Sequence, residues 1–375
     1  MQAPRIHIAE FLKGARDHLL LDVRSPAEYI HAHIPGAINL PLFLNEERKI
    51  VGTAYKQESR EKAIKIGLDL FGPKMRRMVE EVESLVQGLQ SNAQKQDNDQ
   101  WKESITINTV FVYCWRGGMR SGAVSWLLNL YGFKVYMLAG GYKAYRNYVL
   151  KSFEQPFSFK ILGGYTGSGK TTVLKDLQKK GEPVIDLEKI ACHKGSAFGN
   201  IEMLAQPTQE MFENLLSVGL STACLDQNKS RPDLSFNGTG GIWLEDESQR
   251  IGNVNIPMAL WQNMRTSPLY FLEIPFEERL NYIVGEYGSC DVQQLIAATQ
   301  RISKRLGGLE TKNAISFLEE GSIKQAFRIL LHYYDKRYLK GLHNREDTST
   351  LLNKIACEKV TPSNSQALLN QYQTL

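Results

Sequence analysis

Over its first 150 residues, the chain alternates short apolar runs with stretches whose apolar residues recur at helical spacing. The apolar runs end in polar residues or glycine turns and predict β-strands, whereas the intervening stretches predict helices. The runs are HLLLDVRS, GAINLPL, ITINTVFVYC and KVYMLAGG, and the helical stretches include AEYIHAHI and SGAVSWLLNLYG. This alternation is typical of the α/β fold class and predicts an α/β domain over residues 1–150. Helix-forming residues from about 45 to 100, ending in the polar segment QSNAQKQDNDQWKES, predict an insertion within it.

A second α/β domain is predicted for residues 157–290, after the linker KSFEQPFS. It starts with FKILGGYTGSGKTTVLKDL, in which an apolar run, a glycine-rich loop and a helical stretch follow one another. Later apolar runs, PVIDL, GIWLE and PLYFLEI, predict further strands, and EKIACHKGSAFG, after the first of them, predicts a polar loop. From 291 to 375, an apolar period near 3.6 predicts a helical, basic C-terminal region.

Composition and cysteine spacing limit the class of protein. The chain has 375 residues, of which 42% are hydrophobic, so it can bury a large core. It contains no uncharged apolar run of about 18 residues, and its first residues lack the pattern of a secretory signal. We therefore expect a cytoplasmic protein with no membrane partner. Five cysteines without a C-x-x-C pair argue against a disulfide framework and a thiolate zinc site, so we expect reduced thiols and no assigned metal ligand.

Positive charge is concentrated toward the C-terminal end of the sequence. The whole chain has a net charge of +5, whereas residues 301–345 contain ten Lys or Arg and four Asp or Glu. A basic helical surface with interleaved aromatic residues favours contact with nucleic acid. The alternative is a solvated helical face with no binding role. The candidate contact residues are Lys336, Arg337 and Lys340, which lie beside Tyr333, Tyr334 and Tyr338.

The segment VYCWRGGMRS places Cys114 at the end of a predicted strand, before two glycines and the start of a helix. Backbone N–H groups of such a turn and the positive end of a helix dipole stabilise a thiolate. Arg116 and Arg120 add positive charge, so we expect Cys114 to be an ionised nucleophile with these arginines as its catalytic partners. The alternative is a buried cysteine with a structural role.

The segment GYTGSGKT fits the phosphate-loop pattern G-x-x-x-x-G-K-[ST], and it lies between a predicted strand and a predicted helix. Lys170 supplies a point charge to a bound phosphate, and the Thr171 hydroxyl is suited to hold Mg²⁺. The motif predicts phosphate binding, but it does not establish that the ligand is ATP or that anything is hydrolysed. The residues expected to surround the phosphate are Gly164, Thr166, Gly167, Ser168 and Gly169.

Two further polar segments are candidates for the same site. His193 and Lys194, in the predicted loop with two glycines, are suited to a second anionic group. Glu245, Asp246 and Glu247 follow an apolar run, as acidic residues that orient metal or water do in phosphate-loop proteins. The alternatives are an ordinary polar histidine and an exposed acidic turn. Arg279 is expected either to face phosphate or to form an ion pair.

Three segments resemble, in order, the opening motif, active-site loop and closing motif of rhodanese-type sulfurtransferase domains. They are LLLDVRSPAEYIHAHIPGAINLP, CWRGGMRS and LAGGYKAY. The resemblance implies that Cys114 carries a persulfide, that residues 115–120 form its cradle, and that Asp22 and Arg24 have structural roles. The long helical insertion departs from a minimal rhodanese domain.

A rhodanese-like domain followed by a phosphate-loop domain resembles the tRNA 2-selenouridine synthase family over nearly the whole chain. Segments that look like those of the family, in order, are NEERKIVGTAYK, DLEKIACHKGSAFG, QEMFENLL, WLEDESQRIG, RLGG and LLHYYDKRY. The resemblance implies a selenotransferase and geranyltransferase that acts on tRNA. Selenium from selenophosphate replaces the sulfur of 2-thiouridine at the wobble position, through an S-geranylated intermediate made from geranyl diphosphate.

The same resemblance implies cofactors and partners. Selenophosphate and geranyl diphosphate are co-substrates, Mg²⁺ is a candidate accessory ion, and no tightly bound cofactor is expected. The implied partners are a tRNA carrying a 2-thiouridine wobble base and an enzyme that supplies selenophosphate. The basic residues Lys336, Arg337 and Lys340 then become candidates for tRNA binding. The geranyl chain also needs an apolar groove. Candidates for its lining are Trp126, Tyr131, Phe198 and Trp261, and the alternative is that these side chains belong to the protein core.

Two other function classes compete with this interpretation. One is a phosphate-loop small-molecule kinase with a regulatory rhodanese-like domain, which predicts steady ATP turnover. The other is a non-catalytic tRNA-binding or sulfur-relay module, which predicts RNA binding without a modified nucleoside.

Overall fold

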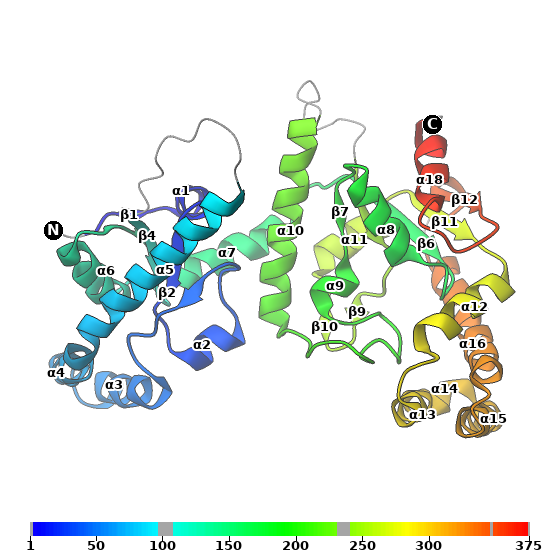
Figure 1. Cartoon of the computed structure of the whole chain (residues 1–375), viewed down its shortest axis with the longest axis horizontal. Coiled ribbons are helices and arrows are strands. Elements are labelled where there is room, and N and C mark those ends of the chain that lie inside the picture. Colours follow the sequence, from blue (N-terminus) through cyan, green and yellow to red (C-terminus); the bar gives the residue numbers. More distant parts are fainter. Residues whose placement is uncertain (1–2, 97–107, 231–240, 346–347, 374–375) are drawn as a thin grey trace. The chain divides into compact units, whose positions relative to one another are not determined.

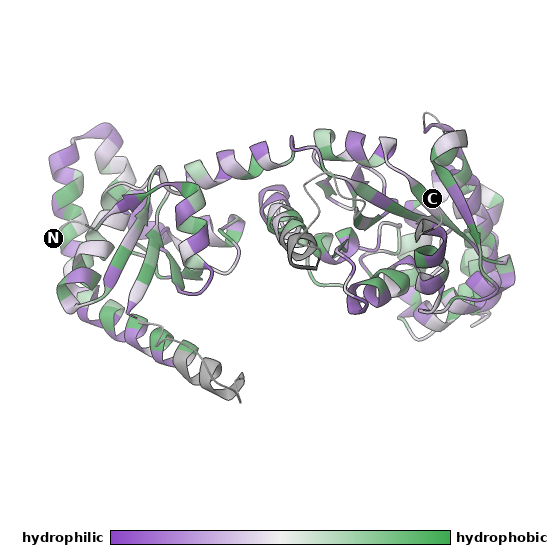
Figure 2. Cartoon of the chain, turned by 90° about the horizontal axis from the view of Figure 1, so that it is seen from above, coloured by the Kyte–Doolittle hydropathy of each residue, from purple (hydrophilic) through white to green (hydrophobic). Residues whose placement is uncertain are grey.

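The computed structural model describes residues 3–96, 108–230, 241–345 and 348–373. The chain divides into two compact units, Met1–Ser152 and Phe153–Leu375, and each is described by itself (Figure 1). Both units contain a parallel β-sheet with helices along it, which confirms the predicted α/β class. In Figure 2, the strands of each unit carry mostly apolar residues, whereas the helices show both apolar and polar residues.

The first unit is built on a five-stranded sheet of order β1-β5-β4-β2-β3, in which all pairs are parallel. Its central strand, β4, is apolar and almost entirely buried because strands on both sides and helices on the faces cover it. The strands are β1 (Arg5–Ile6), β2 (Leu19–Asp22), β3 (Ile38–Asn39), β4 (Thr109–Tyr113) and β5 (Lys134–Leu138). The helices outside the insertion are α1 (Ile8–Ala15), α2 (Pro26–His31), α6 (Met119–Tyr131) and α7 (Gly141–Ser152).

A buried ion pair supports the carboxyl edge of this sheet. Asp22 ends β2 opposite Tyr113, and its carboxylate accepts hydrogen bonds from Arg24 at 2.6 to 3.0 Å. The Arg24 guanidinium also donates to the Ala32 carbonyl and lies 3.8 Å from the centre of the Tyr142 ring. Both charges are buried and satisfied, so these residues fix the loops that surround the sheet edge.

The predicted insertion consists of three α-helices that pack against the core of the first unit. They are α3 (Asn45–Gln57), α4 (Arg60–Phe71) and α5 (Met75–Gln96), with a short 3₁₀ turn, η1 (Gly72–Lys74), before α5. Met78, Val82 and Val86 lie at helical spacing on α5 and pack in the same core as the sheet. Most of the polar segment predicted after this helix lies outside the described residues.

The second unit has a five-stranded parallel sheet of order β12-β11-β6-β8-β7. The phosphate-loop strand β6 is central, between β8 and β11. The strands are β6 (Phe159–Gly164), β7 (Val184–Ile185), β8 (Ile242–Glu245), β11 (Leu269–Glu273) and β12 (Leu352–Ala356), with a separate antiparallel pair, β9 (Arg250–Ile251) and β10 (Val254–Asn255). The helices that follow or cover these strands are α8 (Lys170–Lys179), α9 (Leu187–Ala191), α10 (Gln209–Ser230), α11 (Met258–Thr266), α12 (Phe276–Tyr287) and α18 (Asn364–Gln373).

The C-terminal region differs from the helical prediction because it supplies a strand. The strand β12 pairs with β11 over five residues, and its Ile355 is buried in the sheet core. The remaining elements are α13 (Val292–Arg301), α14 (Ser303–Leu306), α15 (Gly308–Glu319), α16 (Ile323–His343) and α17 (Thr348–Leu351). A second difference is the short helix α9, which begins the segment predicted as a polar loop; its N-cap Asp186 accepts a hydrogen bond from the Lys189 N–H. In the described part of the chain, no helix has both the length and the apolar character needed to span a membrane.

Candidate functional site

Cys114 directly follows β4 at the carboxyl edge of the first sheet, as the sequence predicts. Its side chain is only 3% exposed, and its Sγ lies 3.3 Å from the Ser121 hydroxyl on α6. The Ser121 hydroxyl also donates to the Gly118 carbonyl at 3.1 Å. The loop thus encloses a buried thiol that solvent reaches little, and the nucleophilic role of Cys114 stays a prediction.

The loop around Cys114 closes by backbone contact with the start of α7. The Tyr142 N–H donates to the Cys114 carbonyl at 2.8 Å, and the Lys143 N–H donates to the Trp115 carbonyl at 3.0 Å. Gly141 has a φ of +60°, and a Cβ on it would lie 2.3 Å from the Cys114 carbonyl oxygen. A side chain on Gly117 would lie 2.5 Å from the Leu138 carbonyl oxygen. Glycine is therefore required on both sides of this backbone contact.

The two arginines expected to stabilise a thiolate have different surroundings. Arg120 donates to both carboxylate oxygens of Glu28, at 2.7 and 3.3 Å, so the charge of Arg120 is balanced by this ion pair. The pKa of the Glu28 carboxyl is lowered, because the hydrogen bond and charge of Arg120 outweigh the effect of its burial. Arg116 is exposed. Sequence reasoning missed Glu28, which forms a capping box at the start of α2 and lies far from the loop in sequence.

The phosphate loop connects β6 to α8, which confirms the predicted strand, loop and helix. Lys170 donates to the Gly164 carbonyl at 3.1 Å, so its ammonium lies over the loop. The Ser168 hydroxyl is buried and has no hydrogen-bond partner among the described residues. A Cβ on Gly167 would lie 2.8 Å from Ile283 Cδ1 and 2.9 Å from the Arg279 carbonyl oxygen, so the loop packs tightly against α12.

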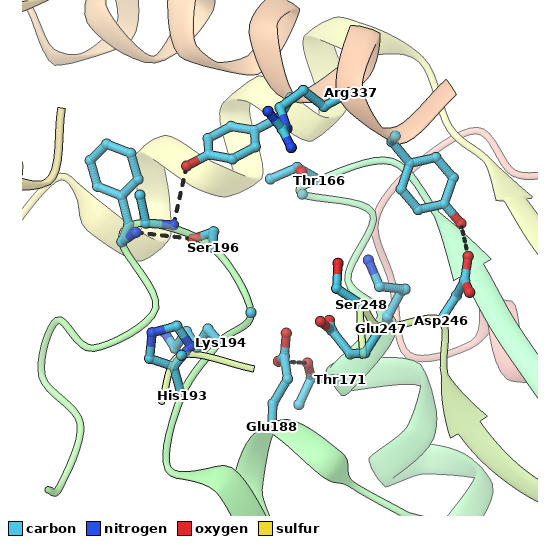
Figure 3. Close-up of a pocket in the computed structure, with 18 of the residues that line it drawn as sticks. Thr166, Thr171, Glu188, His193, Lys194, Ser196, Asp246, Glu247, Ser248 and Arg337 are labelled. Atoms are coloured by element: carbon cyan, nitrogen blue, oxygen red, sulfur yellow. Dashed lines mark hydrogen bonds between the residues drawn. The ribbon is translucent and has the colours of Figure 1, made fainter. Parts of the chain in front are cut away.

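Carboxyl groups gather beside the phosphate loop, at the carboxyl ends of β7 and β8. The Thr171 hydroxyl donates to Glu188 at 3.1 Å, and the Glu188 N–H donates to Glu245 at 2.8 Å. Figure 3 shows Glu188, Thr171 and Glu247 pointing toward one another. Burial raises the pKa of Glu188, and burial together with the charge of Glu188 raises the pKa of Glu247 to about 8.

The buried member of this group is Glu245, which is 2% exposed. Burial, followed by the charges of Asp186 and Glu188, holds its pKa well above the ordinary value. Across the described ranges, no group of three or more His, Cys, Asp or Glu side chains is arranged to hold a metal ion. The Thr171 hydroxyl, predicted as a Mg²⁺ ligand, donates to Glu188 in this structure, and Mg²⁺ binding stays a prediction. Sequence reasoning overlooked Glu188, whose only sequence signal is its position directly after a strand.

The Asp246 carboxylate bonds to side chains of the C-terminal region, and its role in orienting metal or water stays a prediction. The carboxylate, labelled in Figure 3, accepts a hydrogen bond from the Tyr338 hydroxyl at 2.7 Å. It accepts a second one from Arg345 at 3.3 Å. Arg279 likewise forms an ion pair, donating to both carboxylate oxygens of Asp335 at 2.8 and 2.9 Å. Asp246, which follows β8, and Arg279, which lies on α12, are therefore both bonded to α16.

His193 and Lys194 lie in the loop after α9, facing the same space as the phosphate loop. The His193 side chain is 9% exposed, and its Nδ1 has no partner within the described ranges. Burial, and to a smaller extent the charge of Arg301, lowers the pKa of His193, so the ring is neutral at pH 7. Lys194 forms an ion pair with Glu286 at 3.2 Å.

One cavity of about 2310 Å³ unites most of the predicted residues of the second unit. The phosphate loop, the loop after α9, the segment after β8 and one face of α16 all contribute to its wall. Its described lining includes eleven Lys or Arg and six Asp or Glu, so the cavity favours anions. Lys336, Arg337 and Lys340 line it, as do Phe198 and Trp261. Cys114, Trp126 and Tyr131 belong to the first unit, where both aromatic side chains are about half exposed.

The folds and sites define a two-unit α/β protein in which a rhodanese-like unit with a cysteine loop precedes a phosphate-loop unit. Family comparison gives the same order: residues 8–70 and 83–148 match the rhodanese-like domain, and residues 157–361 match the tRNA 2-selenouridine synthase AAA domain. These matches confirm both resemblances predicted from the sequence.

Whole-chain comparison extends this result. The chain is similar to the tRNA 2-selenouridine synthase of Nitrosomonas eutropha, with 30% identity over 88% of this chain and 90% of the relative. It is 32% identical to that of Bdellovibrio bacteriovorus, again over 88% and 90%, and 33% identical to that of Cupriavidus necator, over 90% of both chains. The chain belongs to the tRNA 2-selenouridine synthase family.

Proposed function

We propose that this protein is a tRNA 2-selenouridine synthase that replaces the sulfur of a 2-thiouridine wobble base with selenium from selenophosphate. An S-geranylated uridine, made from geranyl diphosphate, is the intermediate. The observation that carries the proposal is the shared cavity, in which the phosphate loop and the α16 cations Lys336, Arg337 and Lys340 form parts of one wall. A diphosphate and the phosphates of an RNA strand can thus be bound within the same space.

The size and chemistry of the cavity support two substrates. At about 2310 Å³ it exceeds the roughly 300–1,000 Å³ of a pocket for one small molecule. The phosphate loop offers the Lys170 ammonium and the unpartnered Ser168 hydroxyl to a phosphate group. Phe198, Ile283 and Phe327 add apolar lining next to these polar groups, which suits the hydrocarbon chain of a prenyl diphosphate.

The proposed order of steps follows from leaving-group chemistry. The uridine 2-sulfur attacks the geranyl carbon and diphosphate leaves; the loop and Lys170 stabilise the negative charge that develops on this diphosphate. Alkylation makes the sulfur a better leaving group, so a selenium nucleophile can attack C2 and release geranyl thiol. Attack of water on the phosphorus of selenophosphate breaks the P–Se bond and gives phosphate and hydrogen selenide, which is the selenium nucleophile. Cys114 is the proposed residue that holds this selenide for attack at C2, and an enzyme supplying selenophosphate is the partner that this chemistry requires.

Mass spectrometry of nucleosides tests the proposal. A tRNA with a 2-thiouridine wobble base is incubated with the full chain, geranyl diphosphate and selenophosphate, each co-substrate also being omitted in turn. We expect S-geranyl-2-thiouridine with geranyl diphosphate alone and 2-selenouridine with both. Unmodified nucleoside together with RNA binding would instead support a binding or relay module, and steady ATP consumption without nucleoside change would support a kinase.

A further inference from the structure

The basic helix α16 is bonded directly to the phosphate loop through Tyr338. The Gly164 N–H donates to the Tyr338 hydroxyl oxygen at 3.3 Å, and the same hydroxyl donates to Asp246 at 2.7 Å. Burial, and then the charge of Asp246, holds the pKa of Tyr338 well above its ordinary value, so the hydroxyl keeps the proton that it donates. One side chain of α16 therefore connects the ends of β6 and β8.

The residues around the start of the loop are shaped to this hydroxyl. A Cβ on Gly163 would lie 2.9 Å from the Tyr338 oxygen, so a larger residue in β6 would displace it. The Tyr165 ring packs edge-on against the Tyr338 ring, with 5.7 Å between the ring centres. Close approach on both sides means that Tyr338 and the loop residues cannot move independently.

A second contact joins the same two elements one helical turn away. Asp335 holds the Arg279 guanidinium in a bidentate ion pair, and Arg279 donates to the Thr166 carbonyl of the loop at 3.1 Å. Asp335 and Tyr338 are three residues apart, which places them on neighbouring positions of one helix face. The loop is thus attached to α16 at Gly164 and, through Arg279, at Thr166.

The cations expected to bind RNA belong to this same stretch of helix. Lys336, Arg337 and Lys340 line the cavity and alternate in sequence with the two residues that hold the loop. A regular helix moves as a rigid element over one or two turns. RNA phosphates bound by these cations therefore act on the element that holds the loop.

We propose that Tyr338 is a positioning residue that couples RNA binding on α16 to phosphate binding by the loop of residues 164–171. This inference rests on the proposed function for the identity of the RNA. RNA that fixes α16 also fixes the Gly164 N–H and the Thr166 carbonyl, so the loop has less conformational freedom left to lose when its own ligand binds. The coupling is favourable, and by linkage each ligand tightens the other to the same degree.

The sign of the coupling separates this mechanism from simple electrostatics. Two polyanions in one cavity repel each other, which weakens the second ligand. Ordering of the loop through Tyr338 has the opposite effect. Loss of the Tyr338 hydroxyl should leave only the repulsion.

Calorimetric titration of the full chain with inorganic pyrophosphate tests this inference, in the absence and presence of saturating 2-thiouridine tRNA. In the wild type, we expect tRNA to tighten pyrophosphate binding by about fivefold or more, within the usual range of coupling between sites. In Tyr338→Phe, the ratio should fall to one or below, while tRNA alone still binds. Thermal unfolding of the variant verifies that it is folded.

Tyr334→Phe is the matched control, because it removes a hydroxyl of the same helix that accepts the Ala197 N–H at 3.3 Å, outside the phosphate loop. It should retain the coupling. Wild-type protein that binds both ligands independently, or Tyr338→Phe that keeps the full ratio, would overturn the inference and leave the proposed function intact. Wild-type protein that does not bind tRNA would overturn both.

Discussion

The Cys114 loop and the phosphate loop have the same local architecture but differ in their exposure. Each follows a central parallel strand and leads through glycines into a helix, at the sheet edge where ligands of α/β proteins usually bind. The Cys114 loop is closed by the backbone of residues 138–143, and Cys114 is 3% exposed. The phosphate loop instead opens onto a cavity of about 2310 Å³.

The difference lies in what each loop touches. The Cys114 loop is held by main-chain contacts that only glycine tolerates at positions 117 and 141, and Cys114 packs in the apolar core of the sheet, so access to the thiol requires the loop itself to move. The loop around Lys170 instead borders a cavity with room for a ligand. In the proposed function, the first loop protects a reactive atom from water and the second admits a diphosphate, so one local architecture would serve both through different surroundings.

The largest expected effect is that of a substitution in the Cys114 loop on the formation of 2-selenouridine. Cys114→Ala should abolish formation of 2-selenouridine, because the proposed selenium carrier is removed, while tRNA binding is nearly unchanged. Nucleoside mass spectrometry and a filter-binding assay measure the two quantities. Cys224→Ala, at a half-buried thiol on α10, is the control and should retain selenation. Wild-type selenation by Cys114→Ala would remove this residue from the chemistry.

In the open loop, Lys170→Ala should slow formation of S-geranyl-2-thiouridine by roughly 10²-fold, as expected for loss of one preorganised charge in a transition state. The transfer by the wild type should need no ATP. Time courses with and without ATP measure both effects, and Lys179→Ala, at the far end of α8, should behave like the wild type. An absolute requirement for ATP would restore the kinase interpretation. Normal transfer by the Lys170→Ala variant would exclude Lys170 from the geranyl site.

The α16 cations that line the cavity predict a graded effect. Replacing Lys336, Arg337 and Lys340 together by Ala should weaken tRNA binding and flatten its dependence on log salt concentration by about 2 units, because fewer counterions are released. Binding isotherms at several salt concentrations measure the slope. The control is the triple alanine variant of the exposed residues Lys304, Lys312 and Lys359, which do not line the cavity. Equal slopes for the two triple variants would identify α16 as a solvated face.

The smallest effect concerns the pH dependence of folding. The pKa of Glu247 is raised from 4.5 to about 8 by its surroundings, so the folded state holds a proton that the unfolded chain releases. The stability from this proton is present below about pH 4.5 and is lost as the pH rises toward 8. Glu247→Gln, which stays neutral, should gain a few degrees in Tm relative to the wild type between pH 5 and 8. For the control Glu319→Gln, at an exposed residue, the difference in Tm from the wild type should not change with pH. A pH-independent difference for Glu247→Gln would contradict the raised pKa.

Sequence periodicity predicts most strands of the two parallel sheets and most helices because local patterns determine them, although it misses β12, and the two loops carry recognisable motifs. The partners of the site residues depend on the packing of distant segments. Arg120 bonds to Glu28, and Asp246 bonds to Tyr338, across 92 residues of sequence in each case. Neither motif therefore indicates these partners. Glu188 became part of the site for a topological reason: β7 and β8 are adjacent and parallel, which brings their carboxyl ends together.

The position of β12 has a consequence for synthesis of the protein. Residues 352–356 form an edge strand of the sheet that holds the phosphate loop, although β6, its central strand, begins at Phe159. On the ribosome, the second unit cannot complete its sheet until nearly all of the chain has emerged, whereas every strand of the first unit is already available at Leu138. The Cys114 loop can therefore fold early, whereas the sheet that holds the phosphate loop is complete only when β12 has joined it.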